Sequence, residues 1–189
     1  GVQIAKQKHH VDDFHPELVQ ADIPTLYQEL YRTVTRLYLA TRNPDTGVGN
    51  FLILHLITSL WGLEKVLQAV ERGGYKDVDT LTRKAIAAWW ANLICFLAGS
   101  TGGMPSVEKL QKIQQGDFAD TNISPNDNLD WSDVVQRGIA EEEEHNIKLV
   151  YVAKELWNRY GHWHPFFEVA NSFTTTPNIG PATPQYDDA

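Results

Sequence analysis

The chain has 189 residues, of which 42% are hydrophobic, enough for one domain with a sizeable core or for part of a larger protein. Its formal net charge is −8 and no window clusters Lys and Arg, so we expect no nucleic-acid partner. The single cysteine, Cys95, excludes a disulfide framework within the chain, disfavours a thiolate zinc site and suits a reducing, cytoplasmic setting.

Hydrophobic spacing predicts an all-α chain arranged as a multi-helix bundle or array, and no stretch alternates with the period-two pattern of a strand. The polar residues 1–22 are expected to form a loop or short-helix entry. Residues 1–173 constitute the predicted helical domain, and the tail 174–189, rich in Thr and Pro, is expected to lie extended. The predicted helices span residues 24–41, 50–71, 79–98, 105–115, 131–160 and 164–173, and Asp130 caps the fifth.

The two most apolar stretches, residues 51–63 and 85–98, are shorter than the roughly 20 residues that cross a bilayer. We therefore expect buried helices, with Cys95 as a small core residue, and no membrane span. The chain begins at Gly1 and its only methionine is Met104, so we expect a fragment, a processed chain or one half of something larger.

The helix predicted at residues 50–71 carries His55 inside an apolar run and is expected to be buried on every side. A buried imidazole needs a hydrogen-bond partner or a metal ion. His55 is therefore either a core histidine satisfied by a carbonyl or by Thr58, one turn on, or a metal ligand. On this helix alone the first interpretation is favoured.

The inward stripe of the helix predicted at residues 131–160 is interrupted by Glu141 and His145. Lys148 follows His145 by three positions, so both side chains project from the same face. Burial of Lys148 would favour a neutral amine, which reacts with carbon dioxide to give a carbamate that binds a metal as a carboxylate does. The sequence thus makes His145 and Lys148 candidate metal ligands together with His55.

Two alternatives stay open. Glu142 and His145 form a Glu-x-x-His pair, the spacing of di-iron carboxylate oxidases, but the second pair that such a site needs is absent from the sequence, and Glu142 and Glu143 otherwise indicate a solvated face. In the other alternative the chain is a non-catalytic helical interaction subunit, and His145 and Lys148 pair with neighbouring acids.

Aromatic residues could form a pocket for a flat ligand. The adjacent Trp89 and Trp90 are candidates for its walls, as is Trp61, although tryptophans at helical spacing are more often core residues. Four further histidines are assigned surface or packing roles: His9, His10, His162 and His164.

Three segments, FLILHLITSLW, AAWWANLICFLAGSTGGMP and WSDVVQRGIAEEEEHNIKLVYVAKEL, together resemble the C-terminal half of questin oxidase-like proteins. These are fungal and bacterial enzymes that oxidatively open anthraquinone rings. The characteristic pieces are a His followed at the third place by Thr, a small-residue turn ending in Pro, and His-x-x-Lys on a late helix. They occur in the same order over residues 51–156.

The resemblance implies that the chain is part of a larger helical enzyme of secondary metabolite biosynthesis. Its reaction would be a Baeyer–Villiger-like, O2-dependent ring cleavage of an aromatic polyketide of the anthraquinone type. The resemblance also implies a non-haem iron centre with histidine ligands and a carboxylated lysine. Carried over by motif, His55, His145 and Lys148 would bind the iron, and Thr58 would support catalysis.

The same resemblance implies NADPH as an external reductant, although the chain contains no Gly-rich dinucleotide fingerprint. The family has a further N-terminal half with its own histidine cluster, which has no counterpart here. We expect that half to be a separate chain or a further segment of the same protein, and to supply more histidine ligands. Trp61, Trp89 and Trp90 would then line the substrate pocket.

Overall fold

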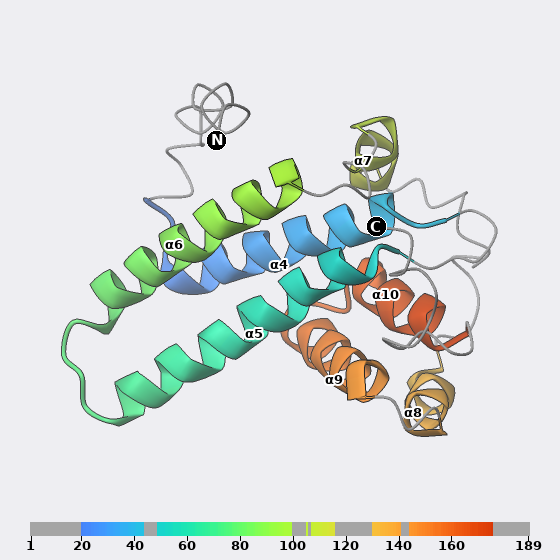
Figure 1. The fold of residues 1–189 in the computed structure, drawn as a ribbon. Helices are drawn as coiled ribbons and strands as arrows, with labels where there is room; N and C mark the ends of the chain where they lie inside the picture. Colours follow the sequence, from blue (N-terminus) through green and yellow to red (C-terminus); the bar gives the residue numbers. More distant parts are fainter. Residues whose placement is uncertain are drawn as a thin grey trace. The chain divides into compact units, whose positions relative to one another are not determined.

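The computed structural model describes residues 20–43, 49–99, 105, 107–115, 130–140 and 144–175 (Figure 1). These residues form helices and connecting turns without any strand, so the prediction of an all-α chain is confirmed. The helices are α4 (Ile23–Ala40), α5 (Phe51–Arg72), α6 (Val78–Gly99), α7 (Val107–Gln114), α8 (Trp131–Ala140), α9 (Glu144–Arg159) and α10 (His164–Thr175).

The first four predicted helices agree with α4 to α7 to within two residues at each end, and α10 begins at the predicted His164. Asp130 caps α8 as predicted, because its Oδ1 accepts hydrogen bonds from the backbone N–H groups of Ser132, at 2.8 Å, and Asp133, at 3.3 Å. The predicted entry at residues 1–22 lies outside the described residues except for its last three. The first two residues of the predicted extended tail, Thr174 and Thr175, are helical and belong to α10, and the tail from residue 176 onward lies outside the described residues.

The chain divides into two compact units. The first unit comprises residues 1–30 and 60–104, and the second comprises residues 31–59 and 105–189, so that α4 and α5 contribute to both. Burial in the first unit agrees only in part with the prediction for residues 85–98. Ile86, Leu93 and Leu97 are buried, but Cys95 is exposed, so its assignment to the core is wrong.

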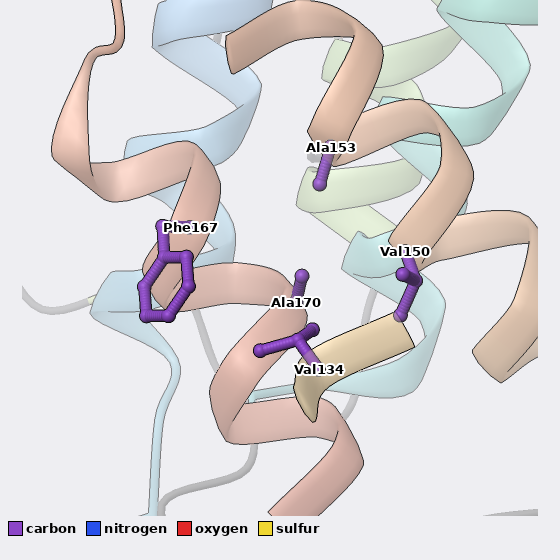
Figure 2. Close-up of a cluster of buried hydrophobic side chains, with 5 residues drawn as sticks. All are labelled: Val134, Val150, Ala153, Phe167 and Ala170. Carbon is purple, nitrogen blue, oxygen red and sulfur yellow. The ribbon is translucent and has the colours of Figure 1, made fainter. Parts of the chain in front are cut away.

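The long helix predicted at residues 131–160 is instead two helices, α8 and α9. A straight α-helix would place Val134 and Val150 about 24 Å apart. In the structure both belong to one buried cluster, and a Cβ atom added to Gly138 would lie 3.0 Å from Cγ2 of Val150. α8 and α9 therefore pack against each other, and both pack on α10. The cluster, whose side chains point toward one another in Figure 2, consists of Val134, Val150, Ala153, Phe167 and Ala170.

Among the described residues, α5 is the one helix long and apolar enough to cross a bilayer by length and composition. A core helix passes the same test, and Ile53, Leu54 and Ile57 are almost completely buried within this chain. Glu64, farther along the helix, is 5% exposed, and its Oε1 accepts a hydrogen bond from Gln68 at 3.2 Å. These features are typical of a core helix, as predicted for residues 51–63, but the expectation of burial on every side is wrong, because Leu52 is 42% exposed and His55 is half-buried.

The start of α5 is fixed to the end of α4 by a chain of hydrogen bonds. Asn50 caps α5, because its Oδ1 accepts from the backbone N–H groups of Leu52, at 2.9 Å, and Ile53, at 3.3 Å. The N–H of Asn50 donates to Oγ1 of Thr41 at 2.8 Å, and that hydroxyl donates to the carbonyl of Tyr38 at 2.6 Å. The first turn of α5 is thereby held in one orientation.

Gly49, just before this cap, lies too close to Tyr38 for any side chain. An added Cβ would lie 2.7 Å from two ring carbons of Tyr38 and 2.8 Å from its carbonyl oxygen, and the Tyr38 ring is fully buried and cannot move aside. Gly49→Ala is therefore expected to lower the free energy of unfolding by about 1–3 kcal/mol, measured by urea denaturation.

Gly62 in α5 is the matched control for Gly49, because a Cβ there would meet nothing within 4 Å. Gly62→Ala is expected to raise the free energy of unfolding by up to about 1 kcal/mol through helix propensity. Equal unfolding midpoints for the two alanine variants would contradict the close approach at Gly49.

Candidate functional site

Two imidazoles from helices distant in sequence lie next to each other in the second unit. The ring centroids of His55, on α5, and His145, on α9, are 5.3 Å apart, and the ring planes are inclined by 64°. The side chain of His145 is 13% exposed, and His55 is half-buried. The structure therefore brings together two of the three predicted metal ligands.

The tautomer of His55 follows from its hydrogen bond. Its Nδ1 lies 2.9 Å from the carbonyl oxygen of Phe51, one turn earlier. A carbonyl only accepts, so Nδ1 carries the proton and the lone pair of the neutral ring resides on Nε2. A carbonyl partner is found both for core histidines and for metal-bound histidines, so this bond is consistent with either interpretation.

Thr58 is half-buried on the same helix. Its hydroxyl donates to the backbone carbonyl of His55 at 3.4 Å and not to the imidazole. The structure therefore shows no hydrogen bond from Thr58 to the His55 ring, for which Thr58 was one of two expected partners. A catalytic role for Thr58 stays a prediction.

Lys148 follows His145 on α9, but its side chain is exposed. At about 100° per residue, Lys148 points about 120° away from the centre of the buried stripe of α9, whereas His145 lies about 60° from it. The expectation that Lys148 faces a dry interior is therefore wrong for this structure. The buried stripe consists of Asn146, Leu149, Val150, Val152, Ala153 and Leu156.

Of the four consecutive glutamates that precede His145, the structure describes Glu144 alone. Oε1 of Glu144 lies 3.9 Å from Nε2 of His145, and the Glu144 side chain is 75% exposed, so solvent weakens this contact. Glu141, Glu142 and Glu143 lie outside the described residues. The Glu142–His145 pair of the di-iron alternative therefore stays a prediction.

The three tryptophans predicted to line a pocket belong to the first unit, whereas the histidine pair belongs to the second. Trp61 is buried, and Nζ of Lys65 lies 4.0 Å from the centre of its ring. Trp89 and Trp90 are half-buried, with ring centroids 6.4 Å apart. Their role in binding a substrate stays a prediction.

The remaining histidines differ in environment. His162 is exposed and stacks on Trp157, with ring centroids 5.2 Å apart, which agrees with the predicted packing role. His164 is half-buried, and burial lowers its pKa. His9 and His10 lie outside the described residues.

Sequence reasoning missed a buried ion pair in the second unit. Oε2 of Glu168, on α10, lies 3.1 Å from Nη1 of Arg42, and the side chains are 0% and 12% exposed. Burial raises the pKa of Glu168, and the positive charge of Arg42 acts in the opposite direction. The available signal was a carboxylate inside the apolar run FFEVA, where an acid needs a partner.

The histidine pair fits a metal ion in part. An imidazole nitrogen about 2.1 Å from a metal puts the ring centre roughly 3.2 Å from the ion, and two such rings at 90–110° would be roughly 4.5–5.2 Å apart. The observed 5.3 Å is close to this range. Within the described part of the chain, no group of three or more His, Cys, Asp or Glu side chains could hold a metal, so the pair by itself could offer an ion at most two ligands.

Comparison with known proteins identifies one family. Residues 4–153 match the model of the family described as Questin oxidase-like, a range that includes His55, His145 and Lys148. Neither the curated proteins nor the solved structures contain a match to the chain. Because the family match covers well over half of the 189 residues, the chain belongs to the questin oxidase-like family.

Proposed function

We propose that this protein performs an O2-dependent, Baeyer–Villiger-like ring cleavage of an anthraquinone-type polyketide, at a non-haem iron held in part by His55 and His145. Membership of the questin oxidase-like family supports an oxidase acting on such compounds. The observation that carries the iron-site proposal is the approach of two shielded imidazoles, 5.3 Å apart, from separate helices.

Each residue of the proposed site has a distinct task. His55 presents its Nε2 lone pair because Nδ1 is committed to the Phe51 carbonyl, and His145 supplies the second imidazole from α9. Both rings are partly shielded from bulk water, because the side chain of His145 is 13% exposed and His55 is half-buried. A bound iron would supply the redox chemistry by which O2 reacts with the quinone.

Lys148 is the proposed third ligand, through a carbamate. The side chain is exposed in the described chain, so this proposal requires that other residues cover its amine. Further histidines would come from an N-terminal half or from a second chain. Thr58 is proposed to support the site. The substrate pocket is proposed to be lined by Trp61, Trp89 and Trp90. NADPH is the proposed external reductant, and the proposed setting is the cytoplasm.

The test is an iron assay of the purified full protein, together with O2 uptake in the presence of an anthraquinone. A single iron per active unit and quinone-dependent O2 uptake are expected. Two irons would favour the di-iron carboxylate alternative, and protein without iron or turnover would favour an interaction subunit.

The role of Lys148 is tested separately by Lys148→Ala, with Lys154→Ala, at a half-buried position farther along α9, as the matched control. Lys148→Ala is expected to lower iron content and turnover by at least roughly tenfold, as loss of a ligand should, and the control is expected to change neither. Wild-type iron content and turnover in Lys148→Ala would remove Lys148 from the site.

A further inference from the structure

Phe51 contacts both histidines of the candidate site. Its ring centroid lies 4.7 Å from that of His55 and 4.7 Å from that of His145, with interplanar angles of 71° and 62°. Both contacts are edge-to-face, the arrangement that the charge distribution of aromatic rings favours. The three rings thus form one cluster, and Phe51 also provides the carbonyl that accepts the Nδ1–H of His55.

We propose that Phe51 is the positioning residue of the histidine pair, an inference that rests on the proposed function. Its carbonyl oxygen selects the His55 tautomer with the lone pair on Nε2. Its ring restricts the rotation of both imidazoles about their side-chain bonds. Metal ligands held in advance lose less conformational freedom on binding, so the cluster raises the affinity of the pair for an ion.

The position of Phe51 is itself fixed by its surroundings. It is the first residue of α5, directly after the cap residue Asn50, whose N–H is bound to Thr41. Gly49 is pressed against Tyr38 and donates its N–H to the Tyr38 hydroxyl at 3.3 Å. The hydrogen bonds of Gly49 and Asn50 therefore hold the backbone from which the Phe51 ring extends to the two imidazoles.

Two measurements are made on protein with ¹⁵N-labelled histidines. NMR of the metal-free protein reports the tautomer of each imidazole ring, and titration of the same protein with Co²⁺ gives the Kd for this ion. Phe51→Leu removes the aromatic edge but keeps an apolar side chain. The backbone carbonyl stays in this variant, but an imidazole that the ring no longer holds in place should rotate away from it part of the time. We therefore expect the His55 and His145 signals to move toward an average of tautomers, and the Kd for Co²⁺ to rise roughly tenfold, as for other residues that orient metal ligands. Phe51→Tyr, which keeps the ring, is expected to restore both.

Phe167→Leu is the matched control. It removes a buried aromatic ring of the same unit, whose ring contacts are with Trp131, Trp157 and His164. It is expected to leave the tautomers of the histidine pair and the Co²⁺ affinity unchanged. Phe51→Met, whose unbranched and flexible side chain can fill the space left by the ring in more ways, serves if the leucine variant does not fold.

The outcomes separate this inference from the proposed function. Wild-type tautomers and wild-type Co²⁺ affinity in Phe51→Leu or Phe51→Met would overturn the positioning role and leave the metal site standing. A wild-type protein that binds no Co²⁺ would overturn the metal site, and the tautomer comparison would still decide whether Phe51 orients the two rings.

Discussion

Replacement of Glu168 by alanine is expected to lower the free energy of unfolding by about 3–5 kcal/mol, the usual cost of breaking a buried ion pair. Glu168 is fully buried and Arg42 nearly so, and the substitution removes the carboxylate that neutralises the guanidinium at 3.1 Å. It also leaves a cavity in α10. Urea denaturation at neutral pH measures the effect.

The matched control is Glu108→Ala, because Glu108 is 79% exposed and pairs with Lys112 on the surface of α7. That change is expected to cost less than about 1 kcal/mol. The double variant Arg42→Met with Glu168→Leu, which replaces both charges by apolar side chains, is expected to be more stable than Glu168→Ala. Equal losses for Glu168→Ala and Glu108→Ala would contradict the burial of the pair.

The raised pKa of Glu168 also predicts how the free energy of unfolding depends on pH. Burial raises the pKa of Glu168 above its ordinary value of 4.5, although Arg42 opposes the shift, so the folded chain binds this proton more tightly than the unfolded chain does. The contribution of this proton to the free energy of unfolding is therefore fully present below pH 4.5, and it is lost as the pH rises through the raised pKa of Glu168. Glu168→Gln is expected to flatten this part of the stability profile, and a profile identical to that of the wild type would contradict the assignment.

The double variant His55→Ala and His145→Ala is expected to lower iron content and turnover at least about 100-fold, because it removes both imidazole ligands, and loss of groups that only support ligands already costs up to that much. His162→Ala is the control, since His162 is exposed and stacks on Trp157. Iron content and turnover should be unchanged in that variant. Full activity of the double variant would exclude the pair from the site.

Most of the helices were predictable because capping, glycine turns and apolar spacing act locally. Asp130 marks the start of α8 from the sequence alone, and α5 ends just before two glycines, Gly73 and Gly74, of which Gly74 has a φ of 86°. The packing of α8 against α9 was not predictable, because the run of glutamates from residue 141 to 144 has high helix propensity and the sequence there contains no breaker. The separation of the two helices follows from the shared packing of Val134 and Val150, which is a tertiary effect.

The candidate site was predictable to a similar extent. His55 and His145 were identified because each is a polar residue within an apolar stripe. That the two rings lie close together depends on how α5 and α9 pack, which the sequence does not show. Lys148 was placed inside because it shares a face with His145, whereas the buried stripe of α9 is centred away from both. Phe51 carries no polar group, so the sequence offered no signal for its contacts with the two rings.

The central claim, that His55 and His145 bind one metal ion, is tested most directly by X-ray absorption at the iron edge of the full protein. The wild type should show imidazole nitrogens in the iron coordination sphere, and each of His55→Ala and His145→Ala should lack one of them. The same imidazole count in the wild type and in both variants would show that these two rings do not touch the metal.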